Sequence, residues 1–290
     1  MIQSWPAGPD FSRIVRISLM AAAATLTGFL LYQPAPDVTT VLAVSGVFLL
    51  AAGAGALNHY QDREIDGLCV RTCDRPLPRR QISNRHAILF AAVLGLAGLL
   101  VLSFMPAATG PMLLGLLAVV IYNGIYTPLK KKTSLALIPG SLGGTLPPLI
   151  GWVAAGGSLL TLKVWGLMAV LGLWQMPHFW LLLLSHRQDH RRAALPSLLG
   201  ALALGPFKRI VFVWILAFTV TTLTLPLVHI VITPWPRWLL VTCSGFLLAS
   251  SGFVLLKPRH GLADSFLFKL LNMHMGLILL LVALDNLALG

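Results

Sequence analysis

The chain has 290 residues, of which 57% are hydrophobic and 10% are charged, and its mean hydropathy is +0.84. This composition excludes an ordinary soluble domain and predicts a polytopic, all-α membrane protein. The net charge of +12 does not indicate nucleic-acid binding, because the basic residues stand in short segments between long apolar runs. Cys69, Cys73 and Cys243 do not have the spacing typical of a zinc site.

Apolar runs of about 17 to 25 residues are long enough to span a bilayer as helices. We expect about nine such spans, at residues 14–32, 38–58, 87–104, 111–126, 135–154, 162–185, 210–232, 238–256 and 266–287. The first run is long and follows Arg13, so we expect it to remain as a membrane helix rather than to be cleaved as a signal peptide. One domain over residues 1–290 is expected, with loops at about 59–86, 127–134 and 186–209 capping the active site.

Basic residues occur almost entirely on alternate connections. All of the 21 lysine and arginine residues except Lys163 and Arg237 fall on one predicted side of the membrane. The positive-inside rule then predicts a cytoplasmic N-terminus and an outside C-terminus in the cytoplasmic (inner) membrane.

A ladder of polar residues at the end of the second run is the most informative segment. The chain has only nine acidic residues, and three of them stand at Asp62, Glu64 and Asp66. Asn58, Asp62 and Asp66 follow one another at intervals of four residues, which places them along one face of a helix. Carboxylate and amide oxygens favour Mg²⁺, which often shares its ligands with substrate phosphates. We therefore predict that Asn58, Asp62 and Asp66 hold Mg²⁺ against a diphosphate.

Basic residues after the ladder can bind the remaining diphosphate oxygens. Arg71 and Arg75 lie in the next segment, and guanidinium groups bind phosphate through paired hydrogen bonds. Tyr126 and Lys130 follow the fourth run on the same predicted side, where Lys130 would bind phosphate and Tyr126 would direct its hydroxyl group to the substrate. The alternative is an ordinary membrane anchor with surface ion pairs, which contribute little energy.

The sixth run contains the cluster Trp174-Gln-Met-Pro-His178-Phe-Trp180. His178 could bind a porphyrin iron, donate a proton or bond to a neighbouring helix, and Trp174 is a further candidate for substrate binding. Asp189 follows at the predicted membrane surface, where it could supply another metal-binding carboxylate or form a salt bridge within its loop.

Together these segments resemble the UbiA superfamily of intramembrane prenyltransferases, and within it the branch that farnesylates haem. The resemblance covers nearly the whole chain. It rests on the ladder, on Arg71-Thr-x-x-Arg75-Pro-Leu, on Tyr126-Thr-x-x-Lys130, on Pro147-Pro148-Leu-Ile-Gly151-Trp152 and on Trp174-Gln-x-Pro177-His178-Phe-Trp180. The ladder alone is typical of enzymes that use polyprenyl diphosphates, whereas the last two segments are typical of the haem branch.

The resemblance implies a bundle of nine helices around a cavity open to lipid, and Mg²⁺ as the cofactor. It implies transfer of a farnesyl group from farnesyl diphosphate to a vinyl group of haem B, with water added, to give haem O. Because haem O is the precursor of haem A in terminal oxidases, the haem A synthase and the oxidase assembly machinery are expected partners. In one departure from the haem branch, His190 follows Asp189 where that branch has a tyrosine, and His190 is the candidate to contact diphosphate or haem there.

Two other functions fit parts of the pattern. The first is a related transferase that prenylates an aromatic quinone precursor. The second is a carrier of haem or lipid, in which intramembrane histidine and aspartate residues mark a permeation path. The acceptor consumed distinguishes the first, and dependence on Mg²⁺ and diphosphate excludes the second.

Overall fold

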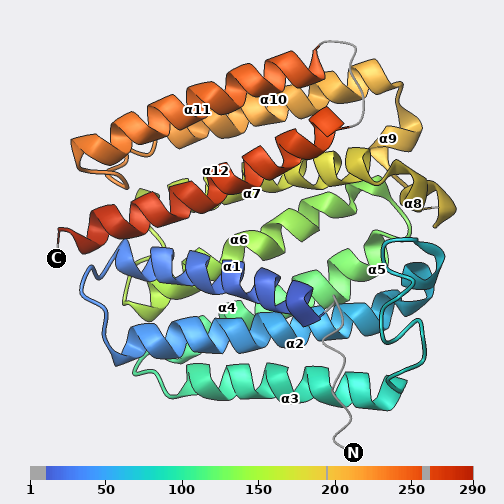
Figure 1. Ribbon diagram of the computed structural model, residues 1–290. Helices are drawn as coiled ribbons and strands as arrows, with labels where there is room; N and C mark the ends of the chain where they lie inside the picture. The colour runs from blue at the N-terminus through green and yellow to red at the C-terminus, as the bar shows by residue number, and fades with distance from the viewer. Residues whose placement is uncertain (1–10, 194, 257–261, 290) are drawn as a thin grey trace, which may run out of the picture.

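The computed structural model describes residues 11–193, 195–256 and 262–289, and every regular element in these ranges is helical. The long helices lie side by side in one bundle, and the beginning of α1 and the end of α12 lie at opposite ends of it (Figure 1). The elements are α1 (Phe11–Leu30), α2 (Val38–Leu68), α3 (Asn84–Ser103), α4 (Thr109–Val119), the π-helix η1 (Val120–Tyr126), α5 (Thr127–Leu129), the 3₁₀-helix η2 (Ser134–Ala136), α6 (Leu137–Ala154), α7 (Leu162–Ser185), α8 (Arg187–Arg192), α9 (Leu198–Ala201), α10 (Leu204–Leu223), α11 (Pro234–Leu255) and α12 (Leu262–Leu287).

Eight helices in the described ranges are long and apolar enough to cross a membrane, against the nine expected from the sequence. The other expected span, residues 135–154, corresponds to α6, which is helical but is diluted by glycine and by Pro147 and Pro148. α6 packs against α1, α4 and α7 inside the bundle. Its surroundings are therefore largely protein, and they require less apolar surface than a lipid-facing helix does.

α2 extends beyond the predicted membrane run and carries the whole ladder. Its start is fixed by Asp37, whose side chain accepts a hydrogen bond from the backbone N–H of Thr40 at 3.0 Å. The helix continues past Asn58 to Leu68, so the connection to α3 begins only at Cys69. This extension supports the one-face arrangement that the four-residue spacing predicts.

α10 begins and ends earlier than the predicted run at residues 210–232. It starts at Leu204, and its first turn contains Pro206, which is favourable there because the first backbone N–H groups of a helix have no partner within it. It ends at Leu223, shortly before Pro226, which disfavours helical geometry in the preceding residue.

α1 and α6 approach each other closely at two glycine residues. A Cβ atom at Gly28 would lie 2.0 Å from the carbonyl oxygen of Pro148, and one at Gly151 would lie 1.9 Å from the carbonyl oxygen of Thr25. These distances are far shorter than any van der Waals contact, so a side chain at either position would force the two helices apart. The close crossing fixes α6 in the middle of the bundle.

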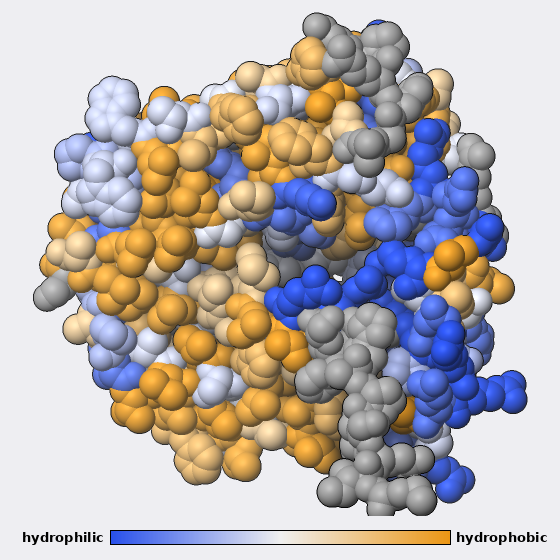
Figure 2. Space-filling model, viewed as in Figure 1, coloured by the Kyte–Doolittle hydropathy of each residue, from blue (hydrophilic) through white to orange (hydrophobic). Residues whose placement is uncertain are grey.

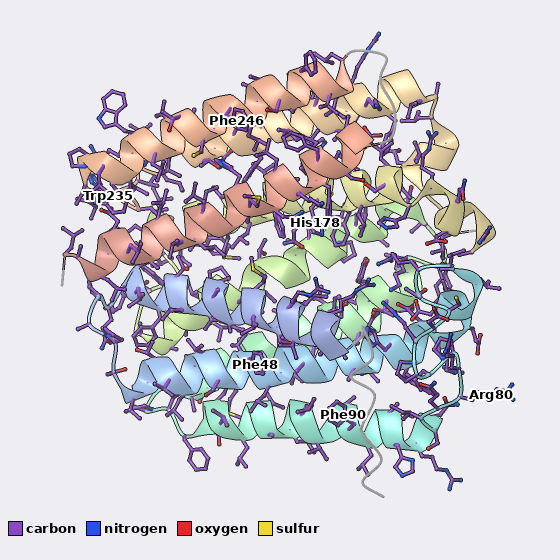
Figure 3. All side chains as sticks on the ribbon, viewed as in Figure 1. Phe48, Arg80, Phe90, His178, Trp235 and Phe246 are labelled. Carbon is purple, nitrogen blue, oxygen red and sulfur yellow. The ribbon has the colours of Figure 1, made fainter. Side chains whose placement is uncertain are left out.

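The bundle surface divides into an apolar body and a polar end. Figure 2 shows hydrophobic side chains over most of one face, and hydrophilic side chains gathered at the end where α8 and the connection after α2 lie. The same face is hollowed between α12 and α1 (Figure 2). In Figure 3, Arg80 lies beyond the helices at the polar end, Trp235 lies at the opposite end, and His178 lies inside the bundle.

Candidate active site

The ladder lies on a buried face of α2, near the polar end of the bundle. Asn58 is 9% exposed, and Asp62 and Asp66 are each 7% exposed. Burial of a carboxylate is costly unless a cation or several hydrogen bonds compensate its charge. The surroundings of these two side chains therefore indicate what the site can bind.

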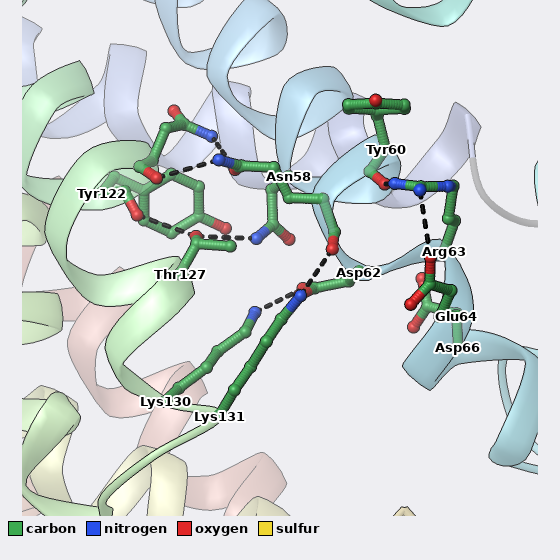
Figure 4. Close-up of polar contacts among 12 residues, drawn as sticks. Asn58, Tyr60, Asp62, Arg63, Glu64, Asp66, Tyr122, Thr127, Lys130 and Lys131 are labelled. Atoms are coloured by element: carbon green, nitrogen blue, oxygen red, sulfur yellow. Dashed lines mark hydrogen bonds and ion pairs between the residues drawn. The ribbon is translucent and has the colours of Figure 1, made fainter. Parts of the chain in front are cut away.

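Each ladder carboxylate is paired with a cationic side chain from another segment (Figure 4 draws the contacts of Asp62). Lys130 Nζ donates to Asp62 Oδ2, and Arg75 Nη1 donates to Asp66 Oδ2. Lys131 Nζ lies 4.0 Å from Asp62 Oδ1, a buried atom that accepts no hydrogen bond from the described residues. The structure thus brings together four predicted site residues and leaves one carboxylate oxygen available to a further ligand.

The π-helix η1 faces the ladder and binds α2 through backbone groups. The N–H of Thr127 bonds to the carbonyl oxygen of Tyr122, whereas in an α-helix it would bond to that of Asn123. The carbonyl group of Asn123 instead accepts a hydrogen bond from Gln61 Nε2 at 2.9 Å, and its side-chain Nδ2 donates to the carbonyl oxygen of Ala54 at 3.0 Å. These bonds attach η1 to α2 on both sides of the first ladder residue.

Tyr126 lies beside the ladder, and its ring is held from three directions. It stacks on Tyr122 with ring centroids 5.6 Å apart, and Lys130 Nζ lies 5.2 Å from its ring centroid. A Cβ atom at Gly140 would lie 2.7 Å from the ring, so this glycine makes room for it. The ring is thereby fixed next to the cation that pairs with Asp62.

Asp189 contacts the segment that follows α2. Its Oδ1 accepts a hydrogen bond from the backbone N–H of Val70 at 2.9 Å, and its Oδ2 accepts one from that of Arg71 at 3.4 Å. Burial, together with the nearby Asp189 carboxylate, raises the pKa of the Cys69 thiol. The side chain of Arg71 is exposed. Asp189 therefore connects α8 to the segment that carries Arg75.

The direct role of Asp189 as a metal ligand stays a prediction. Within the described ranges, no three His, Cys, Asp or Glu side chains form a group that could hold a metal ion. Each Asp189 carboxylate oxygen accepts one backbone N–H and keeps a lone pair, so these bonds do not decide whether it ligates a metal. His190 belongs to α8, but its side chain lies outside the described part of the chain, so its predicted contact also stays a prediction.

His178 has a fixed orientation and a defined tautomer. Asn272 Nδ2 donates to the carbonyl oxygen of Phe268 at 2.5 Å, so Asn272 Oδ1 faces His178 Nδ1 at 2.6 Å and can only accept. This network assigns the proton to Nδ1 and leaves a lone pair on Nε2. The imidazole lies between Trp174 and Phe268, with ring centroids 4.7 Å and 5.1 Å away.

Several polar residues of this region were not identified from the sequence. They are Gln61, Asn123, Thr127 and Asn272, each of which bonds to a predicted site residue or docks the ladder. An isolated polar side chain in an apolar run is a usable signal, because it is costly in a membrane without a partner. That signal marks such residues but does not name their partners.

Comparison with known proteins decides the family. The family model described as the UbiA prenyltransferase family matches residues 20–274. The chain belongs to the UbiA prenyltransferase family. A protein of Geobacter sulfurreducens named protoheme IX farnesyltransferase is 40% identical over 238 residues, which cover 79% of this chain and 86% of that protein. A protein of the same name from Nitratidesulfovibrio vulgaris is 35% identical over 247 residues, covering 85% and 86%.

Solved structures support the same fold for this UbiA family member. A solved structure from work on digeranylgeranylglyceryl phosphate synthase in membranes matches with a TM-score of 0.76 at 18% sequence identity. The match covers 96% of this chain and 98% of that one. A UbiA homologue from Archaeoglobus fulgidus bound to GPP and Mg²⁺ matches with a TM-score of 0.67 at 15% identity, covering 96% and 99%. The predicted helical bundle is thus confirmed.

Proposed function

We propose that this UbiA family protein transfers a farnesyl group from farnesyl diphosphate to a vinyl group of haem B, with addition of water, to give haem O and diphosphate. The names of its relatives support the acceptor and the donor. The observation that carries the proposal is the buried ladder, in which two carboxylates face Lys130 and Arg75 at the polar end of a lipid-facing bundle.

The ladder fits a magnesium ion. Asp62, Asp66 and the amide of Asn58 offer hard oxygen ligands, and the buried Asp62 Oδ1 accepts no hydrogen bond from the part of the chain that the structure describes. The two paired cations compensate negative charge that a metal ion would otherwise neutralise. We propose that these three residues hold Mg²⁺, which when bound would act as a Lewis acid on the leaving diphosphate. Binding of prenyl diphosphate with Mg²⁺ by a structural relative supports this role.

Lys130 and Arg75 have two tasks in this proposal. Without substrate they neutralise the ladder carboxylates. When the ladder holds the metal, they turn to the diphosphate oxygens and stabilise the negative charge that develops there, and the exposed Arg71 binds the outer phosphate oxygens. Tyr126, fixed beside Lys130, directs its hydroxyl group toward the substrate.

His178 and Trp174 are proposed to bind the haem. Because Asn272 holds Nδ1–H, His178 Nε2 has the free lone pair that iron ligation requires. Trp174 lies against the imidazole and offers an aromatic face to the porphyrin. A carrier would need only such a binding site, whereas the cation-lined ladder is explained by diphosphate chemistry.

The reaction balances as follows. The bond between C1 of the farnesyl group and the diphosphate oxygen breaks, and diphosphate leaves with the electron pair. The terminal vinyl carbon of haem forms a bond to C1, which leaves a positive charge on the carbon next to the porphyrin ring. Water adds to that carbon and loses a proton. Apolar walls that exclude water from the allylic cation until the new bond has formed would favour haem as the acceptor.

Location and partners are also proposals. The basic residues near the polar end favour a cytoplasmic position for the site and for the N-terminus. The C-terminus would then lie on the outer side of the inner membrane. Use of haem O by terminal oxidases makes the haem A synthase and the oxidase assembly machinery the expected partners.

The test is haem conversion by membranes that contain the protein. Haem B, farnesyl diphosphate and Mg²⁺ should give haem O by mass spectrometry, and EDTA should abolish it. Asp62→Ala and Asp66→Ala should each abolish the product while the protein remains folded, whereas Glu64→Gln should not, because that side chain is 84% exposed on the same helix. Consumption of the prenyl donor with a phenolic acceptor instead of haem would contradict the acceptor, and normal product from either aspartate variant would contradict the metal site.

A further inference from the structure

We propose that Thr127 is a positioning residue that turns the amide oxygen of Asn58 toward the metal site of the ladder. The inference rests on the proposed function, because it concerns the same metal site. Thr127 is 1% exposed and follows η1 directly, on the side of the segment that faces α2.

The hydroxyl group of Thr127 has one hydrogen, and that hydrogen is already engaged. Its Oγ1 donates to the carbonyl oxygen of Tyr122 at 2.8 Å. Toward Asn58 the hydroxyl oxygen can therefore only accept, and Asn58 Nδ2 donates to it at 2.9 Å. Figure 4 shows this chain of hydrogen bonds from Asn58 through Thr127 to Tyr122.

This bond decides which end of the Asn58 amide faces away from Thr127. An amide has its oxygen and its nitrogen on opposite branches, and only the oxygen can ligate a metal ion. With Nδ2 held by Thr127, Oδ1 points away from it and accepts no hydrogen bond from the described residues. The reversed amide would present two N–H groups to the cation and repel it.

The π-helix determines which carbonyl group engages the hydroxyl hydrogen of Thr127. A threonine in an α-helix commonly bonds to the carbonyl oxygen three or four residues earlier. Here the hydroxyl and the backbone N–H of Thr127 both reach the carbonyl oxygen of Tyr122, five residues earlier. The wider turn thus engages the hydroxyl hydrogen within its own segment and leaves the oxygen to Asn58. Single π-helical turns are often found at functional sites.

Metal binding by the purified protein tests this role without relying on turnover. We would titrate Mn²⁺, as a probe for Mg²⁺, and follow the free ion by electron paramagnetic resonance. Thr127→Val keeps the shape but removes the hydroxyl, and should weaken Mn²⁺ binding by about 10- to 100-fold, as is typical when a residue that orients a ligand is lost. Thr127→Ser keeps the hydroxyl, so its Mn²⁺ affinity should lie within about 2-fold of that of the parent protein. A difference of that size is no larger than the usual scatter between independent mutations.

Thr222→Val is a matched control. Thr222 is fully buried in α10, and its hydroxyl donates only to the carbonyl oxygen of Phe218 at 2.9 Å. It should lose stability as Thr127→Val does, while Mn²⁺ binding stays at the parent value. An equal loss of Mn²⁺ affinity in both variants would assign the effect to general destabilisation and overturn the proposal.

The decisive comparison uses Asn58→Asp as a second background. A carboxylate has an oxygen on each branch, so it needs no orienting partner. Adding Thr127→Val to Asn58→Asp should therefore change Mn²⁺ affinity by less than about 2-fold. The same large loss in both backgrounds, or no loss in Thr127→Val alone, would overturn the inference. Absence of Mn²⁺ binding by the parent protein would instead overturn the proposed metal site, and this inference with it.

Discussion

Two adjacent lysine residues approach Asp62, and we predict that they differ sharply in their effect on turnover. Lys130 Nζ bonds to Asp62 Oδ2 and its side chain is 21% exposed, whereas Lys131 Nζ lies 4.0 Å from Oδ1 and its side chain is 38% exposed. Substitution by methionine removes the charge and keeps most of the length. Lys130→Met should nearly abolish haem O formation, and Lys131→Met should reduce it far less, by about 5-fold.

The magnitudes follow from the two geometries. Unit charges 4 Å apart interact by about 1 kcal/mol in water and by about 4 kcal/mol near a protein surface. Because Lys131 is more than a third exposed, solvent screening places it near the lower limit, about 1 kcal/mol or about 5-fold in kcat/KM. Lys130 also faces the charge that develops on diphosphate, and loss of one such group typically costs about 2.7 to 4 kcal/mol, or about 10²- to 10³-fold.

Haem O formation under initial-rate conditions measures both effects, and metal binding provides an independent check. In the absence of farnesyl diphosphate, Lys130→Met should bind Mn²⁺ more tightly than the parent protein, because the lysine no longer competes for Asp62. A variant that simply unfolds would bind Mn²⁺ more weakly. Equal losses of turnover in the two lysine variants, with Mn²⁺ binding retained in both, would refute the assignment of Lys130 to the diphosphate.

Two further predictions concern the haem side and the packing of the site. Asn272→Leu should fold like the parent protein but bind haem more weakly, because His178 loses the acceptor that fixes its tautomer. A haem titration followed by absorbance measures the affinity. An unchanged affinity would return His178 to a structural role. Gly140→Ala should lower the free energy of unfolding by about 1 to 3 kcal/mol and reduce turnover, because the new methyl group would displace the ring of Tyr126. Gly245→Ala is its control, because no atom of the described residues lies within 4 Å of a Cβ atom there. A comparable loss in this variant would contradict the packing argument.

The sequence was sufficient for the bundle and for the ladder because both depend on local periodicity. Apolar runs identify membrane helices by length alone, and a four-residue interval places Asn58, Asp62 and Asp66 on one helix face wherever that helix packs. Of the nine expected spans, the one that forms α6 does not meet the criteria for a long apolar helix in the described structure. Its glycine and proline residues make contacts with α1 and not with lipid.

Contacts between segments distant in the chain could not be predicted in the same way. The pairing of Lys130 with Asp62 was expected only as a shared side of the membrane, and the π-helical turn before Thr127 has no pattern in the residues of η1 that distinguishes it from an α-helix. The exposed side chain of Arg71 and the bonds from Asp189 to backbone groups likewise depend on how two loops meet. Such features follow from tertiary packing.

The bonds from Asp189 to Val70 and Arg71 also bear on the order in which the protein is assembled. α8 is synthesised long after α2, and seven helical elements, from α3 to α7, lie between them in the chain. Until α7 has entered the membrane and brought Asp189 to the polar end, the segment with Arg75 lacks these two anchoring bonds. A nascent chain can therefore form the ladder early but cannot complete the surroundings of its carboxylates until that later helix is inserted.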